Sequence, residues 1–227
     1  MPGPRAVVFD LDEVLLDSRR AWQYAVEEAI ASVCARRVDA RPLADEYCRR
    51  PWSHALAVLV DDPRQRDRCE QLCGEIFDRS AMKRLLVHDG IGMGLDNLRV
   101  RRIEVGAISR RPHAIALKQC QSTGLDRFLS VLSATPEKDR WDPNQRFSDC
   151  LLFLGYEPSA CAFVSGGGAD LKAIEPHGSR CFAPGWLDPV AGWPVIPSPA
   201  DIFPMISAGV VPQAADSGST SAWQPGQ

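Results

Sequence analysis

Two aspartates near the start of the chain are the residues best placed to do chemistry. Asp10 and Asp12 follow the apolar run at 6–9, which has the pattern of a strand buried on both faces of a parallel sheet. In an extended segment, residues i and i+2 project to the same side, so we expect both carboxylates to point into one crevice at the carboxyl end of the sheet. Two carboxylates so placed are typical of a site for a divalent cation such as Mg²⁺.

Three later positions carry polar side chains that can join this pair. Ser109 follows the apolar run at 103–108, Lys138 lies in the segment EKDRWDP, and Asp170 lies in FVSGGGADLKA. Taken alone, Ser109 reads equally as a helix cap and Lys138 as a surface lysine. The glycines at 166–168 could instead cradle an anion, but the segment lacks the Lys-Ser/Thr ending of a P-loop and the third glycine of G-x-G-x-x-G.

The apolar run followed by D-x-D-x-V resembles the first motif of the haloacid dehalogenase (HAD) superfamily of Asp-nucleophile phosphohydrolases. The resemblance implies that Asp10 attacks a phosphate monoester, while Asp12 protonates the leaving alcohol and then activates water. It implies that Ser109 and Lys138 contact the transferring phosphoryl group. It also implies that Asp10, Asp12 and Asp170 hold Mg²⁺, and that the partner is a small phosphorylated metabolite.

The chain departs from the family pattern at three positions. The proline that usually follows the lysine is Asp139, and Glu13 occupies a position that is usually glycine. The first acid of the pattern G-D-x-x-x-D is Gly166, so one negative ligand is lost and metal affinity should fall. These departures favour an alternative, a catalytically degenerate binding or regulatory protein with the same fold. Hydrolytic dehalogenation without metal is a third possibility, which the acid at Asp12 argues against.

Strand-length apolar runs alternate with helical stretches along most of the chain. This alternation predicts an α/β fold with a mainly parallel sheet, and the resemblance implies a Rossmann-like, HAD-like core. The expected strands lie at 6–9, 103–108, 128–132, 161–164 and 179–183, and the expected helices of the core at 112–122, 144–155 and 170–175.

The long segment between the first two strands reads as helix. Residues 22–33 and 69–77 keep the i, i+4, i+7, i+8 apolar spacing of amphipathic helices. We therefore predict a core at 1–15 and 88–195 and a helical cap at 16–87, which resembles the cap of phosphoglycolate phosphatases and β-phosphoglucomutases.

Glycines and prolines punctuate the rest of the chain. Gly90, Gly92 and Gly94 suit a hinge or turns where the cap returns to the core. Prolines crowd from Pro184 onward, so residues 196–227 are expected to form an irregular wrap, with at most a short helix at 200–207, and then a disordered tail.

Composition excludes several function classes. The 26 basic and 29 acidic side chains leave a net charge of −3, which lacks the basic excess of a nucleic-acid binder. No apolar run reaches membrane-spanning length and the amino terminus lacks a signal-peptide pattern, so we expect a cytoplasmic protein without membrane partners. The eight cysteines include no C-x-x-C pair, which favours buried free thiols over a zinc site or disulfides. Nothing in the sequence indicates the oligomeric state.

Overall fold

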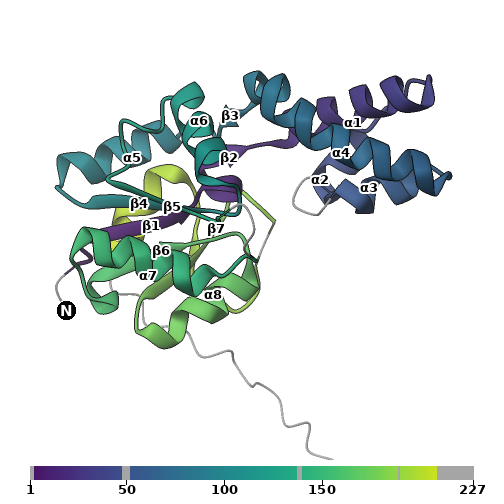
Figure 1. Cartoon of the computed structure of the whole chain (residues 1–227). Helices are drawn as coiled ribbons and strands as arrows, with labels where there is room; N and C mark the ends of the chain where they lie inside the picture. The colour runs from purple at the N-terminus through teal and green to yellow at the C-terminus, as the bar shows by residue number, and fades with distance from the viewer. Residues whose placement is uncertain (1–2, 48–51, 137–139, 189, 209–227) are drawn as a thin grey trace, which may run out of the picture.

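A six-stranded parallel sheet forms the centre of the computed structural model, which describes residues 3–47, 52–136, 140–188 and 190–208 (Figure 1). The strand order is β5-β4-β1-β6-β7-β8, and every neighbouring pair is parallel. This confirms the α/β prediction and places β1 between β4 and β6. The strands are β1 (Ala6–Asp10), β4 (Glu104–Ser109), β5 (Val131–Ala134), β6 (Cys161–Val164), β7 (Arg180–Pro184) and β8 (Val195–Ile196).

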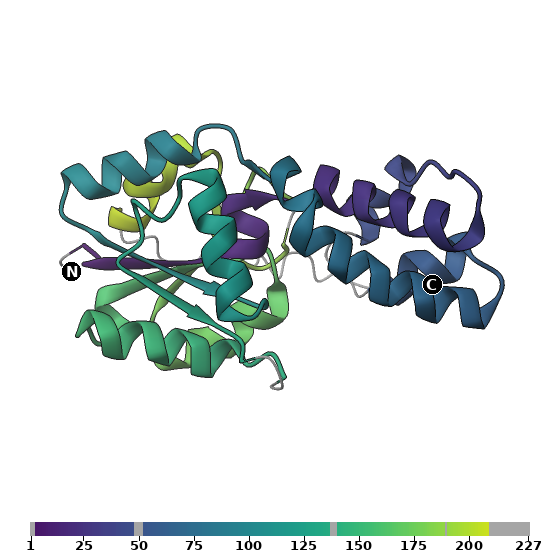
Figure 2. The ribbon, with the colours of Figure 1, turned by 45° about the horizontal axis from the view of Figure 1, so that its top comes forward.

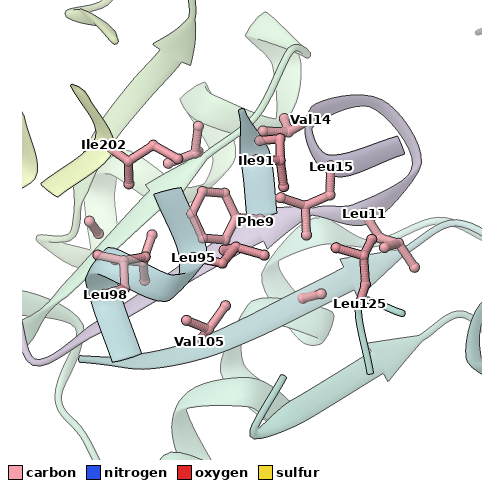
Figure 3. Packing of buried hydrophobic residues seen from close by; sticks show 14 of the residues in the cluster. Phe9, Leu11, Val14, Leu15, Ile91, Leu95, Leu98, Val105, Leu125 and Ile202 are labelled. Carbon is pink, nitrogen blue, oxygen red and sulfur yellow. The ribbon is translucent and has the colours of Figure 1, made fainter. Parts of the chain in front are cut away.

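Helices cover both faces of this sheet, and alternate residues of β1 point into each layer. Val7 and Phe9 face α5, α6 and α9, whereas Ala6 and Val8 face α7 and α8. Figure 3 shows Phe9 among the buried leucines of α5. The covering helices are α5 (Ile91–Val100), α6 (His113–Thr123), α7 (Pro143–Leu154), α8 (Gly168–Ile174) and α9 (Ile202–Ser207), with short 3₁₀ turns at Pro158–Ala160, Glu175–His177 and Pro199–Asp201.

A second group of helices projects from the sheet domain (Figure 2). It contains α1 (Arg19–Cys34), α2 (Arg41–Tyr47), α3 (Trp52–Leu59), α4 (Pro63–Arg79) and a 3₁₀ turn at Ala81–Arg84. Its core is its own, since the Trp52 ring lies 6.0 Å from Trp22 and 5.7 Å from Phe77 between ring centres. None of the helices in the described ranges is long and apolar enough to cross a membrane.

Two short antiparallel strands join this helical group to the sheet domain. They are β2 (Leu16–Asp17) and β3 (Leu86–Val87), which lie on either side of the helices in the sequence. The chain therefore leaves and re-enters the sheet domain at one place. The boundaries 16–87 for a cap domain stay a prediction.

The segment after β7 folds onto the sheet and contains the short helix expected at 200–207, which is α9, together with a two-residue strand, β8, that was not expected. β8 adds an edge strand next to β7, where the prolines at 194 and 197 cost no central ladder bonds. Ile202 and Ile206 of α9 are fully buried in the same cluster as Phe9. The expected disordered tail at 209–227 lies outside the described residues.

Two of the three glycines expected to form a hinge or turns are helical instead. Gly92 and Gly94 lie within α5, whereas Gly90 precedes it with a φ of +83°, a left-handed conformation that favours glycine. A Cβ on Gly94 would lie 2.5 Å from the carbonyl oxygen of Pro199. Gly94 therefore permits the close approach of α5 to the C-terminal segment.

This packing leads to a test of whether the C-terminal segment belongs to the folded core. Ile202→Ala should lower the free energy of unfolding by about 3 kcal/mol, because it leaves a cavity under α5. Leu152→Ala is the matched control, since Leu152 is 85% exposed and its loss should change stability by less than about 0.5 kcal/mol. Urea unfolding of both variants measures the difference, and equal stabilities would show that α9 is not part of the cooperative core.

Candidate functional site

Three central strands end at one edge of the sheet and bring polar side chains together there. Asp10 ends β1 and Ser109 ends β4, while Ser165 directly follows β6. All three side chains are fully buried. The carboxyl ends of parallel strands are where open α/β sheets bind ligands, so this edge is the candidate active site.

A π-helical turn (η1, Leu11–Leu15) positions Asp12. The prediction that both aspartates project from an extended segment is wrong, because the strand ends at Asp10. The turn buries Leu11, Val14 and Leu15 together beside Phe9, which an extended chain with alternating faces would not do. The backbone N–H of Asp12 donates to Oδ1 of Asp10 at 3.1 Å, so the two acids are adjacent for a different reason than expected.

The end of β4 holds the carboxylate of Asp12. Its Oδ2 accepts a hydrogen bond from Oγ of Ser109 at 2.9 Å and another from the backbone N–H of Arg110 at 2.7 Å. Ser109 in turn accepts from the backbone N–H of Arg111 at 3.0 Å. The structure thus brings together Asp10, Asp12 and Ser109 from two neighbouring strands.

Asp170 lies on the opposite side of β1, in the first turn of α8. Its side chain is almost fully buried, and each of its oxygens accepts a hydrogen bond from a different residue. Nη2 of Arg110 donates to Oδ2 at 2.6 Å, and Nε1 of Trp141 donates to Oδ1 at 3.1 Å. The guanidinium of Arg110 also lies 4.6 Å from the centre of the Trp141 ring.

Sequence reasoning assigned no role to Trp141 or Ser165. Oγ of Ser165 lies 3.5 Å from Oδ2 of Asp10 and accepts from the backbone N–H of Gly167 at 3.0 Å. A Cβ on Gly167 would lie 3.0 Å from the Asp170 carboxylate, so glycine allows the loop to approach that acid closely. The position of Ser165 directly after a buried strand, like that of Ser109, was the available signal. Trp141 left no such signal.

The family resemblance implies that Asp10, Asp12 and Asp170 hold a divalent metal, and the contacts of these acids bear on that expectation. Both oxygens of Asp170 already accept hydrogen bonds from Arg110 and Trp141. Within the described ranges, no group of three or more His, Cys, Asp or Glu side chains is arranged to hold a metal ion. In this arrangement Asp10, Asp12 and Asp170 do not fit a divalent cation, and the assignment of Mg²⁺ stays a prediction.

Three positions singled out by the sequence lie wholly or partly outside the described residues. Lys138 and its neighbour Asp139 lie outside the described residues, as does the side chain of Glu13. The phosphoryl contact expected of Lys138 therefore stays a prediction.

A cavity of about 430 Å³ opens between Asp12 and the helical group, a size within the range of small-molecule sites. Asp12 lines it from the sheet side and Arg19 from α1. Nη2 of Arg19 lies 2.6 Å from Oδ2 of Asp17, and this hydrogen bond lowers the pKa of the Asp17 carboxyl. His88 and Trp186 also line the cavity, and the Trp186 indole donates to the carbonyl oxygen of Val14 at 3.1 Å. Sequence reasoning named none of these walls except Asp12.

The cysteines of the described residues have the character of buried thiols. The seven cysteines that the structure describes are free, and all but Cys34 are buried, which confirms the expectation of buried thiols for them. Burial raises the pKa of Cys73, Cys120 and Cys150 to about 12. These groups stay protonated near neutral pH and are poor nucleophiles.

Known sequences are similar to this chain over most of its length. A family model described as haloacid dehalogenase-like hydrolase matches residues 4–178. A phosphoglycolate phosphatase of Pseudomonas savastanoi pv. phaseolicola is 26% identical over 195 residues, which cover 79% of this chain and 69% of that protein. A phosphoglycolate phosphatase of Pseudomonas syringae pv. syringae is 25% identical over 194 residues, with the same coverage.

Solved structures share the fold at lower identity. A HAD-superfamily hydrolase of subfamily IA from Geobacter sulfurreducens has a TM-score of 0.75 at 18% identity, covering 90% of this chain and 97% of that one. Protein tyrosine kinase A of Mycobacterium tuberculosis has a TM-score of 0.74 at 18% identity, covering 92% and 99%. Because proteins named for different activities share this fold, these likenesses show the fold alone. The family model, which matches most of the chain and includes the acids at the sheet edge, shows that this chain belongs to the haloacid dehalogenase-like hydrolase family.

Proposed function

We propose that this hydrolase is a phosphatase that cleaves a small phosphate monoester through an aspartyl-phosphate on Asp10. The observation that carries the proposal is the pairing of a buried carboxylate with a second one that faces a cavity. Asp10 ends the central strand, and Asp12 lies beside it with its carboxylate oriented by Ser109 and by the backbone of Arg110. Asp12 also lines the cavity, where a leaving group has room.

In the first step a carboxylate oxygen of Asp10 attacks phosphorus, and the bond from phosphorus to the leaving oxygen breaks. Asp12 gives its proton to that oxygen, so the product leaves as an alcohol. In the second step Asp12 takes a proton from water, whose oxygen attacks the phosphorus of the aspartyl-phosphate. Inorganic phosphate leaves, and the Asp10 carboxylate is restored.

The volume of the cavity favours a small substrate, and the chemical class of that substrate is the subject of the substrate panel below. Two relatives are named phosphoglycolate phosphatase, and with such a substrate the leaving alcohol would carry a carboxylate. Arg19 places a cation on the cavity wall, and it already pairs with Asp17 and Asp45. The carboxylate of such a substrate would compete with these acids for Arg19. Phosphate esters of sugars, whose leaving alcohols carry no charge, are therefore tested beside phosphoglycolate.

Mg²⁺ is the cofactor that the family resemblance implies, and we assign no step to it. The acids expected to hold it do not fit it as they stand, since Asp170 is bonded to Arg110 and Trp141. Activity is therefore measured both with Mg²⁺ and in the presence of a chelator.

The bonding of Asp170 to Arg110 and Trp141 favours a second candidate, a binding protein that has lost turnover. In a protein that no longer binds the metal, Asp170 can pair with an arginine and position 166 needs no acid. The fold and the cavity would then serve to bind a phosphorylated ligand without cleaving it.

A substrate panel separates these functions. We expect phosphate release from at least one small monoester and no halide release from 2-haloacids, because Asp12 is placed to protonate an alcohol oxygen. Phosphate and halide are measured on the same enzyme preparation, with phosphoglycolate, sugar phosphates and aryl phosphates as substrates. A panel without phosphate release, from a protein that still binds inorganic phosphate, would support the binding protein. Halide release would support the dehalogenase.

A further inference from the structure

Arg110 spans the candidate active site from one side to the other. Its backbone follows β4, and its guanidinium bonds to Asp170, which follows β6. Because β1 lies between β4 and β6, and strands are about 4.8 Å apart, the side chain must cross the end of β1. The guanidinium therefore lies beside the site where Asp10 and Asp12 leave the sheet.

Three contacts fix the position of this arginine. Its backbone N–H is held by Asp12 at 2.7 Å, its Nη2 by Asp170 at 2.6 Å, and its guanidinium by the Trp141 ring at 4.6 Å. Trp141 also donates to Asp170, so the arginine, the acid and the indole form one closed set. The Arg110 side chain is 39% exposed and the Asp170 side chain 5% exposed. The charge is thus held in place by a buried partner and remains accessible to a ligand.

The charge of this arrangement explains why the acids do not fit a metal. A glycine at 166 supplies no carboxylate, and Arg110 adds one positive charge. A site with an acid at 166 and no arginine would have a net charge lower by two. The difference equals the charge of one divalent cation. A guanidinium bonded to Asp170 also repels a cation that approaches the same carboxylate.

We propose that Arg110 is a fixed cation of this site, where it binds the phosphoryl oxygens of the substrate and competes with divalent metal for Asp170. The inference rests on the proposed function only for the identity of the ligand as a phosphate group. A guanidinium carries five N–H donors in a planar fork, and the bond to Asp170 uses one of them. The fork matches the spacing of phosphate oxygens, which a lysine ammonium does not.

Binding measurements on two neighbouring arginines test this role without turnover. Inorganic phosphate is titrated calorimetrically in the presence of a chelator, and Mn²⁺ is titrated by electron paramagnetic resonance as a substitute for Mg²⁺. Arg110→Gln should weaken phosphate binding about 10- to 100-fold, because charged hydrogen bonds are lost. It should tighten Mn²⁺ binding about tenfold, because Asp170 is released and a positive charge is removed.

Arg111→Gln is the matched control, since it removes the same charge one residue along the chain. The Arg111 guanidinium lies against the Phe77 ring at 4.6 Å, in the helical group. It should leave the binding of both ions within about twofold of the parent, since it gives up no bond to Asp170. If Arg110→Gln does not fold, Arg110→Lys replaces it. That variant should bind phosphate more weakly than the parent because it loses the planar fork.

Equal phosphate affinities for the parent and the Arg110 variant would overturn the inference. Equal losses of phosphate affinity in the Arg110 and Arg111 variants would also overturn it, since the effect would then come from surface charge. An unchanged affinity of Arg110→Gln for Mn²⁺ would overturn the proposed competition for Asp170. Failure of the proposed function is recognised separately. The binding changes would then occur as expected, while no monoester of the panel releases phosphate.

Discussion

Turnover of the best monoester is expected to fall at least about 10⁴-fold in Asp10→Asn, because an amide cannot form the aspartyl-phosphate. Asparagine is nearly isosteric with aspartate, so the fold should persist. Asp10 is fully buried next to Asp12, so a neutral amide at this position removes the repulsion between two adjacent carboxylates. The thermal midpoint should therefore stay unchanged or rise. Steady-state phosphate release and thermal unfolding without metal measure the two effects.

Asp126→Asn is the control for this substitution, since Asp126 is an exposed residue in the turn after α6. It should change neither turnover nor the midpoint. Retained activity in Asp10→Asn would remove Asp10 from the mechanism. A midpoint that drops by many degrees would instead show that the carboxylate stabilises the fold, and the loss of turnover would then say nothing about the nucleophile.

Asp12→Asn should lower turnover of alkyl phosphates about 10³-fold, the usual size of a general acid and base effect. The loss should depend on the leaving group. The aryloxide of an aryl phosphate is a stabilised anion that leaves without a proton, so attack of Asp10 on this substrate should remain fast. Hydrolysis of the aspartyl-phosphate, for which Asp12 activates water, should become slow. Rapid mixing should then show a burst of aryl alcohol equal to the enzyme concentration.

Ser109→Ala provides the comparison for Asp12→Asn, because it removes one of the two donors to the Asp12 carboxylate and leaves the acid itself. It should show a smaller loss and no burst. The absence of an aryl alcohol burst in Asp12→Asn would contradict the role in proton transfer, since formation of the aspartyl-phosphate from an aryl phosphate needs no proton.

The sheet and the order of its central polar residues could be predicted because the responsible signals are local. A strand that is buried on both faces reads as a continuous apolar run, as residues 6–9 and 161–164 do. Asp10 and Ser109 each end such a run, and strand ends in a parallel sheet share one edge. Amphipathic spacing likewise identified α1 and α4, since one face of each helix is buried.

Elements with weak local signals were missed or misplaced. α5 contains Gly92 and Gly94, which lower helix propensity, and its formation depends on packing against Pro199 and Ile202. β8 has two residues and exists because β7 offers an edge. β5 was expected to begin at Phe128, which instead packs on the core from the preceding turn.

The chain's own residues thus determined the α/β class, the helical insertion and the placement of Asp10, Ser109 and Asp170 at strand or helix ends. Only the tertiary structure decided what those side chains contact. Arg110 and Asp170 are separated by 60 positions in the sequence, and they meet across the end of β1, which lies between the strands that precede them. Strand order depends on which faces bury most apolar surface together, a property of the whole chain that no local pattern records.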